Sequence, residues 1–394
     1  MFDLRIDERT PVQQMVPALA ALTDGVLMPG NDVRVIRNGA FFDALLDDVA
    51  AATSSVHLEN YLWKSGRICD RVIAALAAKA RDGVAVRVIH DRLGARHTER
   101  HVFQPLRDAG CETVRHRPSL PLSLAAHNRR DHRKLAVIDG RIAYVFGHAV
   151  ADEWAADDPG AGEWCDIAIR IEGPVVRKIQ SEFIGLWALL SGRALADPVY
   201  FPEPRHAGFV DAHVAAQFST RKPPRSVIQR LYYSAIQLAK RRLLIQSPYF
   251  VPDAEAVRHL CDAARRGVEV RVMCTAAARS DFPFVQHAGH GSLKPLLDAG
   301  VEVLEYGRAG LHQKVIVVDE LWSCVGSANF DPRSFRLSAE LSVGMLDAAT
   351  AGYLAGVFTE DEAHCRAWTR DRWSGRGLQH RVVDGAAALV RAFV

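Results

Sequence analysis

The strongest constraint on the fold of this chain is that its second half repeats its first. In the first half, an apolar stretch at 56–63 precedes a helical pattern at 70–80, then Gly83 and a strand-like stretch at 85–90. The same order recurs in the second half, at 243–250, 254–264, Gly267 and 269–274. Strands that alternate with helices predict an α/β unit, so we expect two such units, each a mixed β-sheet flanked by helices.

The chain is long enough for two domains of ordinary size. Its 394 residues allow each repeat to bury a core of its own. Three prolines between residues 198 and 204 suit an irregular, extended connection between the repeats. We therefore predict a first lobe at 1–195, a linker at 196–214 and a second lobe at 215–394.

One short motif occurs once in each half with the same spacing. It is a histidine, a lysine two residues later and an aspartate five residues after the lysine. The members are His132, Lys134 and Asp139 in the first half and His312, Lys314 and Asp319 in the second. Residues two apart on a strand point to the same face, so each histidine is expected to share a pocket with a cation. Identical spacing within a repeated framework makes coincidence a weak explanation.

Polar side chains follow the second motif. They are Ser327, Asn329, Arg333, Ser334 and Glu340. Hydroxyl, amide and guanidinium groups are donors to phosphate oxygens, so this segment predicts a phosphate pocket beside His312.

These motifs resemble those of the phospholipase D superfamily. Within it, the segments at 247–252, 297–301 and 305–306 are similar to the cardiolipin synthase branch. The resemblance runs from about residue 33 to residue 347 and implies two pseudo-symmetric lobes with both motifs at one active site between them. The chain looks like the shorter kind of cardiolipin synthase, which begins almost at the first lobe and lacks N-terminal membrane helices.

Two histidines can divide phosphodiester chemistry between them. A neutral imidazole attacks the phosphorus and forms a phosphohistidine, while a protonated one gives its proton to the leaving alkoxide. The resemblance implies that His132 is the nucleophile and His312 the acid. Charge on the nonbridging oxygens would be held by Lys134, Lys314, Ser327 and Asn329. Because no carboxylate cluster with metal-ligand spacing is evident, we expect neither a metal nor another cofactor.

Acidic residues downstream of each motif match the family positions that orient the histidines. The resemblance assigns this role to Asp166 and Glu340. The motif aspartates, Asp139 and Asp319, are instead expected to fix the ends of their strands.

The first lobe departs from the family pattern. Where the family usually has Gly-Gly-x-Asn, this chain has Phe146-Gly-His148-Ala149. Ala149 has no side-chain donor, so either His148 or a water replaces the amide, or the pocket relies on Asn329 of the second lobe.

These features predict a phosphatidyltransferase of the cardiolipin synthase type, which transfers a phosphatidyl group from phosphatidylglycerol to a second phospholipid alcohol. The alternatives are a phospholipase D that releases phosphatidic acid and a nuclease on the same scaffold. A non-enzymatic scaffold descended from such an enzyme is a third alternative. The formal net charge of +3 and the lack of a basic, aromatic stripe argue against nucleic acid as a partner.

The expected partners are anionic phospholipids and a membrane surface. Residues 1–32 resemble neither a signal peptide nor a membrane span. Seven scattered cysteines without C-x-x-C pairing suit reduced thiols. We therefore predict a cytoplasmic protein held peripherally on the inner face of the cell membrane. The apolar C-terminal stretch at 382–394 is expected to pack on the core, with a position on the bilayer as the alternative.

Overall fold

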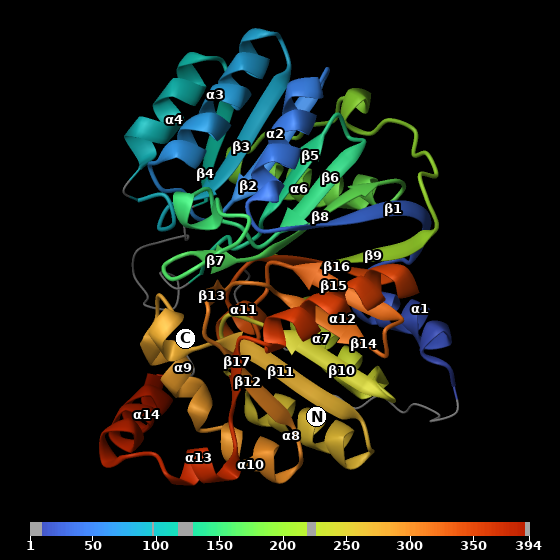
Figure 1. The fold of residues 1–394 in the computed structure, drawn as a ribbon. Coiled ribbons are helices and arrows are strands. Elements are labelled where there is room, and N and C mark those ends of the chain that lie inside the picture. The colour runs from blue at the N-terminus through green and yellow to red at the C-terminus, as the bar shows by residue number, and fades with distance from the viewer. Residues whose placement is uncertain (1–9, 97, 117–128, 219–225, 391–394) are drawn as a thin grey trace.

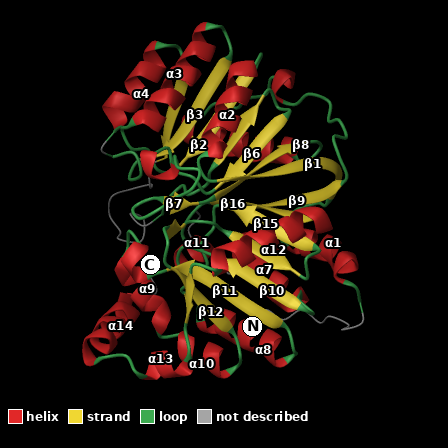
Figure 2. Ribbon diagram, viewed as in Figure 1, coloured by secondary structure: helices red, strands yellow, loops and turns green. Residues whose placement is uncertain are grey.

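Two α/β lobes stand one above the other in the computed structural model, which describes residues 10–96, 98–116, 129–218 and 226–390 (Figure 1). The predicted fold class is thereby confirmed. In the described residues, the strands of both lobes hydrogen-bond into one mixed sheet of fifteen strands (Figure 2). The first nine residues and the last four, which the predictions for the two termini include, lie outside the described residues.

The first lobe is built on seven strands. In sheet order they are β1 (Met28–Arg37), β8 (Ile167–Glu172), β6 (Ile142–Phe146), β5 (Leu135–Ile138), β2 (Ser55–Asn60), β3 (Ala85–Asp91) and β4 (Glu112–His116). Alternate residues of β5 and β6 enter two different cores, since Ala136 and Tyr144 pack with the helices of one face and Leu135 and Val145 with α6. The helices of the first face are α2 (Ala40–Ala51), α3 (Arg67–Arg81) and α4 (Glu99–Asp108), and the opposite face is covered by α6 (Val176–Ser191).

The second lobe repeats this plan. Its strands are, in sheet order, β9 (Val210–Gln217), β16 (Glu340–Leu346), β15 (Trp322–Gly326), β14 (Val315–Val318), β10 (Arg242–Gln246), β11 (Glu269–Thr275), β12 (Glu302–Tyr306) and β17 (Cys365–Ala367). Its main helices are α7 (Val227–Leu238), α8 (Ala254–Arg265), α10 (Leu293–Asp298) and α12 (Ala348–Glu362). Even the register is repeated, because Val56 of β2 pairs with Ile138 as Leu243 of β10 pairs with Val318.

The strands of the two lobes meet where β1 and β9 pair antiparallel, with Asn31 opposite Val210. The predicted linker at 196–214 contains the short 3-10 helix η2 (Pro198–Tyr200) and ends inside β9. The N-terminal helix α1 (Val12–Leu22) packs in the core of the second lobe, where it meets α7. Residues 12–22 therefore lie with the second lobe, although the repeat pattern assigns them to the first.

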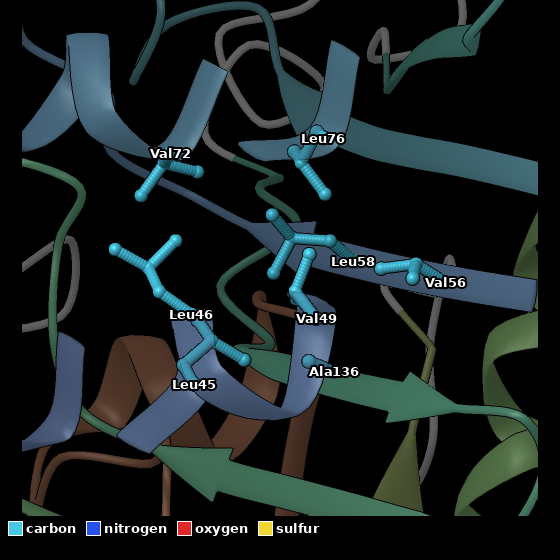
Figure 3. Close-up of a pocket in the computed structure, with 8 residues that line it drawn as sticks. All are labelled: Leu45, Leu46, Val49, Val56, Leu58, Val72, Leu76 and Ala136. Atoms are coloured by element: carbon cyan, nitrogen blue, oxygen red, sulfur yellow. The ribbon is translucent and has the colours of Figure 1, made fainter. Parts of the chain in front are cut away.

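A central apolar core joins the lobes, because α6 and α12 both contribute to it together with strands of both halves. A small cavity of about 10 Å³ lies elsewhere, between α2, α3 and the strands β2 and β5 (Figure 3). Only aliphatic side chains line this cavity, so it is a packing gap and offers no polar group for chemistry. None of the described helices combines the length and apolarity needed to cross a bilayer.

Candidate active site

Both motifs begin just outside the strands that were expected to contain them. Strand β5 starts at Leu135 and β14 at Val315, one residue after the motif lysine in each case. The histidine and lysine therefore lie on extended segments that precede these strands. The physical reason is that these segments pair with the opposite lobe instead of continuing their own sheet.

Two short cross-lobe pairings hold these segments. Asp131 forms a parallel bridge with Ala339 of the second lobe, and the amide of His132 donates to the Ala339 carbonyl at 3.0 Å. In the second lobe, β13 (Gly310–Leu311) pairs in parallel with β7 (Trp164–Cys165) of the first. The amide of His312 then donates to the Cys165 carbonyl at 2.8 Å. Each motif histidine is thus placed beside the acidic residue of the other lobe.

The two histidine–carboxylate pairs are crossed between the lobes. Nδ1 of His132 lies 3.0 and 3.1 Å from the two carboxylate oxygens of Glu340, and Nδ1 of His312 lies 2.7 Å from Oδ2 of Asp166. Both carboxylates are fully buried. An acceptor at Nδ1 favours the tautomer with its proton there, which leaves the lone pair of Nε2 available for reaction. The side chains of His132 and His312 keep 17% and 13% exposure, so both are within reach of solvent.

Burial and positive charge disfavour the protonated imidazoles. Burial lowers the pKa of His132 to about 4, and the Lys134 charge acts in the same direction against Glu340. For His312, burial and the charges of Lys314 and Lys134 lower the pKa well below its ordinary value, and His132 also contributes. This mutual influence shows that the groups of both motifs belong to one electrostatic site.

The motif lysines are themselves buried beside the histidines. Burial lowers the pKa of Lys134 to about 8 and that of Lys314 to about 7. Nζ of Lys134 donates to the His132 carbonyl at 2.9 Å, while Nζ of Lys314 lies 2.9 Å from Nδ1 of His312. Two ammonium groups at this depth favour an anionic ligand between them.

Glu340 is held as a carboxylate by its neighbours. Burial alone would raise the pKa of Glu340, but the His132 ring and the Lys134 charge outweigh it and hold the pKa below its ordinary value. Asp166 differs, because burial raises its pKa despite the opposing charge of Lys314. The two acids thus sit in unequal environments, although they occupy matching positions.

Aromatic rings border both histidines, and the sequence analysis identified none of them as site residues. The Tyr61 ring meets His132 edge-on at 5.2 Å between centroids. Trp154, in the 3-10 helix η1 (Asp152–Trp154), stacks on Trp164, and both rings meet His312 at 5.2 and 5.5 Å. The Trp154 indole also donates to Asp166 at 3.0 Å. The one available signal was the spacing, since Trp164 precedes Asp166 by two residues.

The motif aspartates lie at the far ends of their strands and not among the reacting groups. Asp139 accepts the backbone amides of Thr53, Ser54 and Ser55 at 2.7–2.8 Å, next to the start of β2. Asp319 does the same for the backbone amides of residues 240–242 before β10. Both aspartates adopt positive φ angles, of 52° and 54°. Each motif aspartate therefore follows the last residue of one strand, and its carboxylate holds the backbone at the start of a neighbouring strand.

The Ser327 hydroxyl, which was predicted to contact phosphate, contacts Glu340 in the structure. It donates to Oε2 of Glu340 at 2.5 Å and accepts the Leu341 amide at 3.1 Å. Ser327 is buried in the described structure and contacts Glu340, and its predicted contact with phosphate stays a prediction. Asn329 is also buried, and its Oδ1 has no hydrogen-bond partner within the described part of the chain. Its predicted contact with phosphate stays a prediction.

The first lobe has no amide equivalent to that of Asn329, and His148 does not replace it. The His148 ring is fully buried against Phe41, and its Nε2 donates to the Asn38 carbonyl at 2.8 Å. Ala149 is buried as well. The side-chain donors of the site are therefore unequal between the two lobes.

Comparisons with known proteins agree with this geometry. The family described as "Cardiolipin synthase, PLD-like domain" matches residues 45–187 and 232–361. The major cardiolipin synthase ClsA of Bacillus subtilis is 36% identical over 93% of this chain and 76% of that protein. A cardiolipin synthase of a Geobacillus species is 34% identical over 91% of this chain and 72% of that protein. Among solved structures, the phosphatidylserine synthase of Haemophilus influenzae shares the fold, with a TM-score of 0.73 and 12% identity over 98% of this chain and all of that one.

Proposed function

This chain belongs to the cardiolipin synthase family of phospholipase-D-like proteins, and we propose that it transfers a phosphatidyl group from phosphatidylglycerol to the hydroxyl of a second phospholipid alcohol. The observation that carries this proposal is the pair of crossed histidine–carboxylate contacts. They supply two imidazoles of matching orientation, one from each lobe, and transfer through a covalent intermediate needs two.

In the first half of the proposed reaction, Nε2 of neutral His132 attacks the phosphorus of phosphatidylglycerol. The bond from phosphorus to the glycerol oxygen breaks, and protonated His312 gives its proton to that oxygen. The products are glycerol and a phosphatidyl group on His132. An anionic phosphodiester offsets the charges of Lys134 and Lys314, which removes part of the cause that keeps His312 unprotonated.

In the second half, neutral His312 takes the proton of the incoming alcohol. The alcohol oxygen then attacks phosphorus, the bond to His132 breaks and His132 is regenerated. The rings of Trp154 and Trp164 beside His312 make its surroundings apolar, which favours a lipid alcohol over water as the acceptor. This feature supports transfer over the alternative of hydrolysis.

Product analysis tests the proposal directly. Purified protein given phosphatidylglycerol in mixed micelles, with no added metal, should release glycerol and form cardiolipin. Phosphatidic acid as the only lipid product would instead identify a hydrolase. The His132→Ala variant should lose activity and the acid-labile phosphatidyl-protein intermediate, so an active His132→Ala variant would refute the role of His132 as nucleophile.

We propose further that the protein binds the inner face of the membrane peripherally, through the corner of the second lobe formed by α9 (Pro283–His290) and α14 (Leu378–Val390). Figure 1 shows both helices at the same end of that lobe. The corner carries a concentration of exposed apolar side chains, which are Phe282, Phe284, Leu378, Val382 and Val383. Exposed arginines nearby, at positions 370 and 381, match the charge of anionic lipids.

The corner is linked through Asp281 to the charge of Lys314 in the second motif. The Tyr249 hydroxyl donates to Asp281. Burial raises the pKa of Asp281, whereas this hydrogen bond and the charge of Lys314 lower it. Phe282 follows Asp281 directly and its ring meets Tyr249 edge-on. A membrane surface at this corner would therefore lie next to the motif that holds His312.

Flotation with vesicles tests this assignment. The double variant Phe282→Ser, Phe284→Ser should bind vesicles of phosphatidylglycerol and phosphatidylcholine less tightly than the wild type. Phe209→Ser is the matched control, because Phe209 is 100% exposed but lies beside β9. Equal losses in the double variant and the control would contradict the corner as the membrane contact.

A further inference from the structure

A cluster of potential metal ligands lies on α9 and α14, on elements other than those that hold the motif histidines. It consists of His287 and His290 on α9 and Asp384 on α14. We propose that these three side chains bind a divalent transition-metal ion of the zinc type, which fastens α14 to α9. This inference does not depend on the proposed function.

The three ligand atoms lie close together, all within 4.8 Å of one another. His287 and His290 are three residues apart on one helix, so they share a face. Nδ1 of His287 lies 2.8 Å and Nδ1 of His290 lies 2.9 Å from the same oxygen of Asp384. Tetrahedral zinc with bonds of about 2.0–2.1 Å requires ligand atoms about 3.3 Å apart. Each N–O separation would therefore open by only about half an ångström.

Two carboxylates flank the His290 ring. Its Nδ1 faces Asp384, while its Nε2 lies 3.9 Å from Oε1 of Glu305. At 3.9 Å the Glu305 contact is an ion-pair distance and not a hydrogen bond, and Glu305 also pairs with Arg372. A metal ion on Nδ1 would place its charge near Asp384 and leave Nε2–H facing Glu305. That is the carboxylate–histidine–metal arrangement of many metal sites.

The second oxygen of Asp384 is already held. Arg376 donates to Oδ2 at 2.5 Å, which orients the carboxylate and leaves Oδ1 toward the histidines. His380, one turn earlier on α14, is a further imidazole at this edge of the cluster, with its ring 5.3 Å from that of His287. Nitrogen ligands predominate in this set, which suits zinc and related ions and disfavours Mg²⁺ and Ca²⁺.

A bound metal ion would add a contact to α14, which has few apolar contacts among its described side chains. Among the described side chains of this helix, Ala387 packs with Val251 and Ala288 in a small cluster, whereas Val382 is exposed. Helix α9, in contrast, is well seated, since the side chain of Gln286 donates to the Pro248 carbonyl at 2.7 Å. Binding of the ion would thus hold α14 in a fixed position against α9.

Zinc titration of the purified full-length chain tests the proposal. After dialysis against a chelator, zinc is added in competition with a chromophoric chelator, and the melting temperature is followed in parallel. The wild type should bind one zinc per chain and melt at a higher temperature with zinc. His287→Ala and Asp384→Asn should bind zinc at least about tenfold more weakly and lose the thermal shift, and Glu305→Gln should weaken binding by about tenfold.

Two control variants locate the bound ion. His364→Ala removes an exposed histidine of the second lobe outside the cluster, and His132→Ala removes a histidine of the reaction site. Both should bind zinc as the wild type does. The proposal is overturned if the wild type binds no zinc, or if Asp384→Asn, folded by circular dichroism, retains wild-type affinity.

Discussion

Replacing Asp166 by asparagine tests whether the carboxylate of the first lobe serves the histidine of the second. Asp166 Oδ2 contacts Nδ1 of His312 at 2.7 Å and accepts the Trp154 indole at 3.0 Å. Its Oδ1 accepts the amide of Ile167 at 2.9 Å. Asparagine has one acceptor oxygen and one NH₂ group, so it must turn a donor toward one of these three donors.

The expected loss follows from these contacts. A hydrogen bond between the buried carboxylate and the imidazole is charge-assisted, and such bonds contribute about 1.5–3 kcal/mol. At about 1.4 kcal/mol for each factor of ten, the Asp166→Asn variant should react roughly 10- to 150-fold more slowly with phosphatidylglycerol. The loss should fall on proton transfer by His312, since Asp166 contacts the ring of that histidine.

A substrate with a good leaving group separates the two steps. In a phosphatidyl ester of p-nitrophenol, the leaving group is p-nitrophenolate, which departs without being protonated. Formation of the intermediate from this ester therefore does not need His312 as an acid. With this ester, Asp166→Asn and His312→Ala should both recover much of the rate of intermediate formation. Glu340→Gln should not recover, because Glu340 orients the nucleophile His132.

The matched behaviour of Asp166→Asn and His312→Ala is the decisive result. If Asp166→Asn instead behaves like His132→Ala, with no recovery on the activated ester, then the crossed pairing does not operate in catalysis. Recovery of Glu340→Gln alone would instead exchange the roles of the two histidines.

Three further outcomes follow from the same structure. The value of kcat/KM should fall as pH rises through the lowered pKa values of the motif lysines, about 7 and about 8, because a neutral amine no longer offsets phosphate charge. A fall that begins only near the ordinary lysine pKa would contradict this. Gly310→Ala should lower both the melting temperature and kcat, since its new Cβ would lie 2.3 Å from the Trp164 ring. The control Gly352→Ala, with open space around it in α12, should not lower the melting temperature. Asp139→Ala should cost about 1–3 kcal/mol in urea denaturation, because three backbone amides lose their acceptor, and a greater loss in kcat than in stability would argue for a direct role in catalysis.

Much of the plan of this protein could be predicted without the structure. The order of strands and helices follows from local periodicity, and the expected helix at 254–264 is observed as Ala254–Arg265. The two motifs could be found because their spacing is a property of the chain itself. Their chemistry could be inferred because histidine and lysine at that spacing suit phosphoryl transfer.

Other features could not be predicted because they depend on contacts between distant segments. The contact of the buried Ser327 hydroxyl with Glu340, thirteen residues further along the chain, depends on how β15 and β16 pair. Helix α1 is apolar on one face, yet only packing decides that this face meets α7 of the second lobe. The ring of Trp164 reaches His312 through the pairing of β7 with β13, two strands of two residues each, and Trp154 stacks on it.

The sequence by itself determined that this chain carries two copies of one α/β unit, each with its histidine and lysine, because repeats and spacings are local. Only the tertiary structure decided that each histidine takes its carboxylate from the other copy. That pairing arises from the bridge of Asp131 with Ala339 and the pairing of Gly310 with Trp164, which cross between the lobes. In this fold neither histidine pairs with the acid of its own repeat, so the reaction site is formed by the two lobes together.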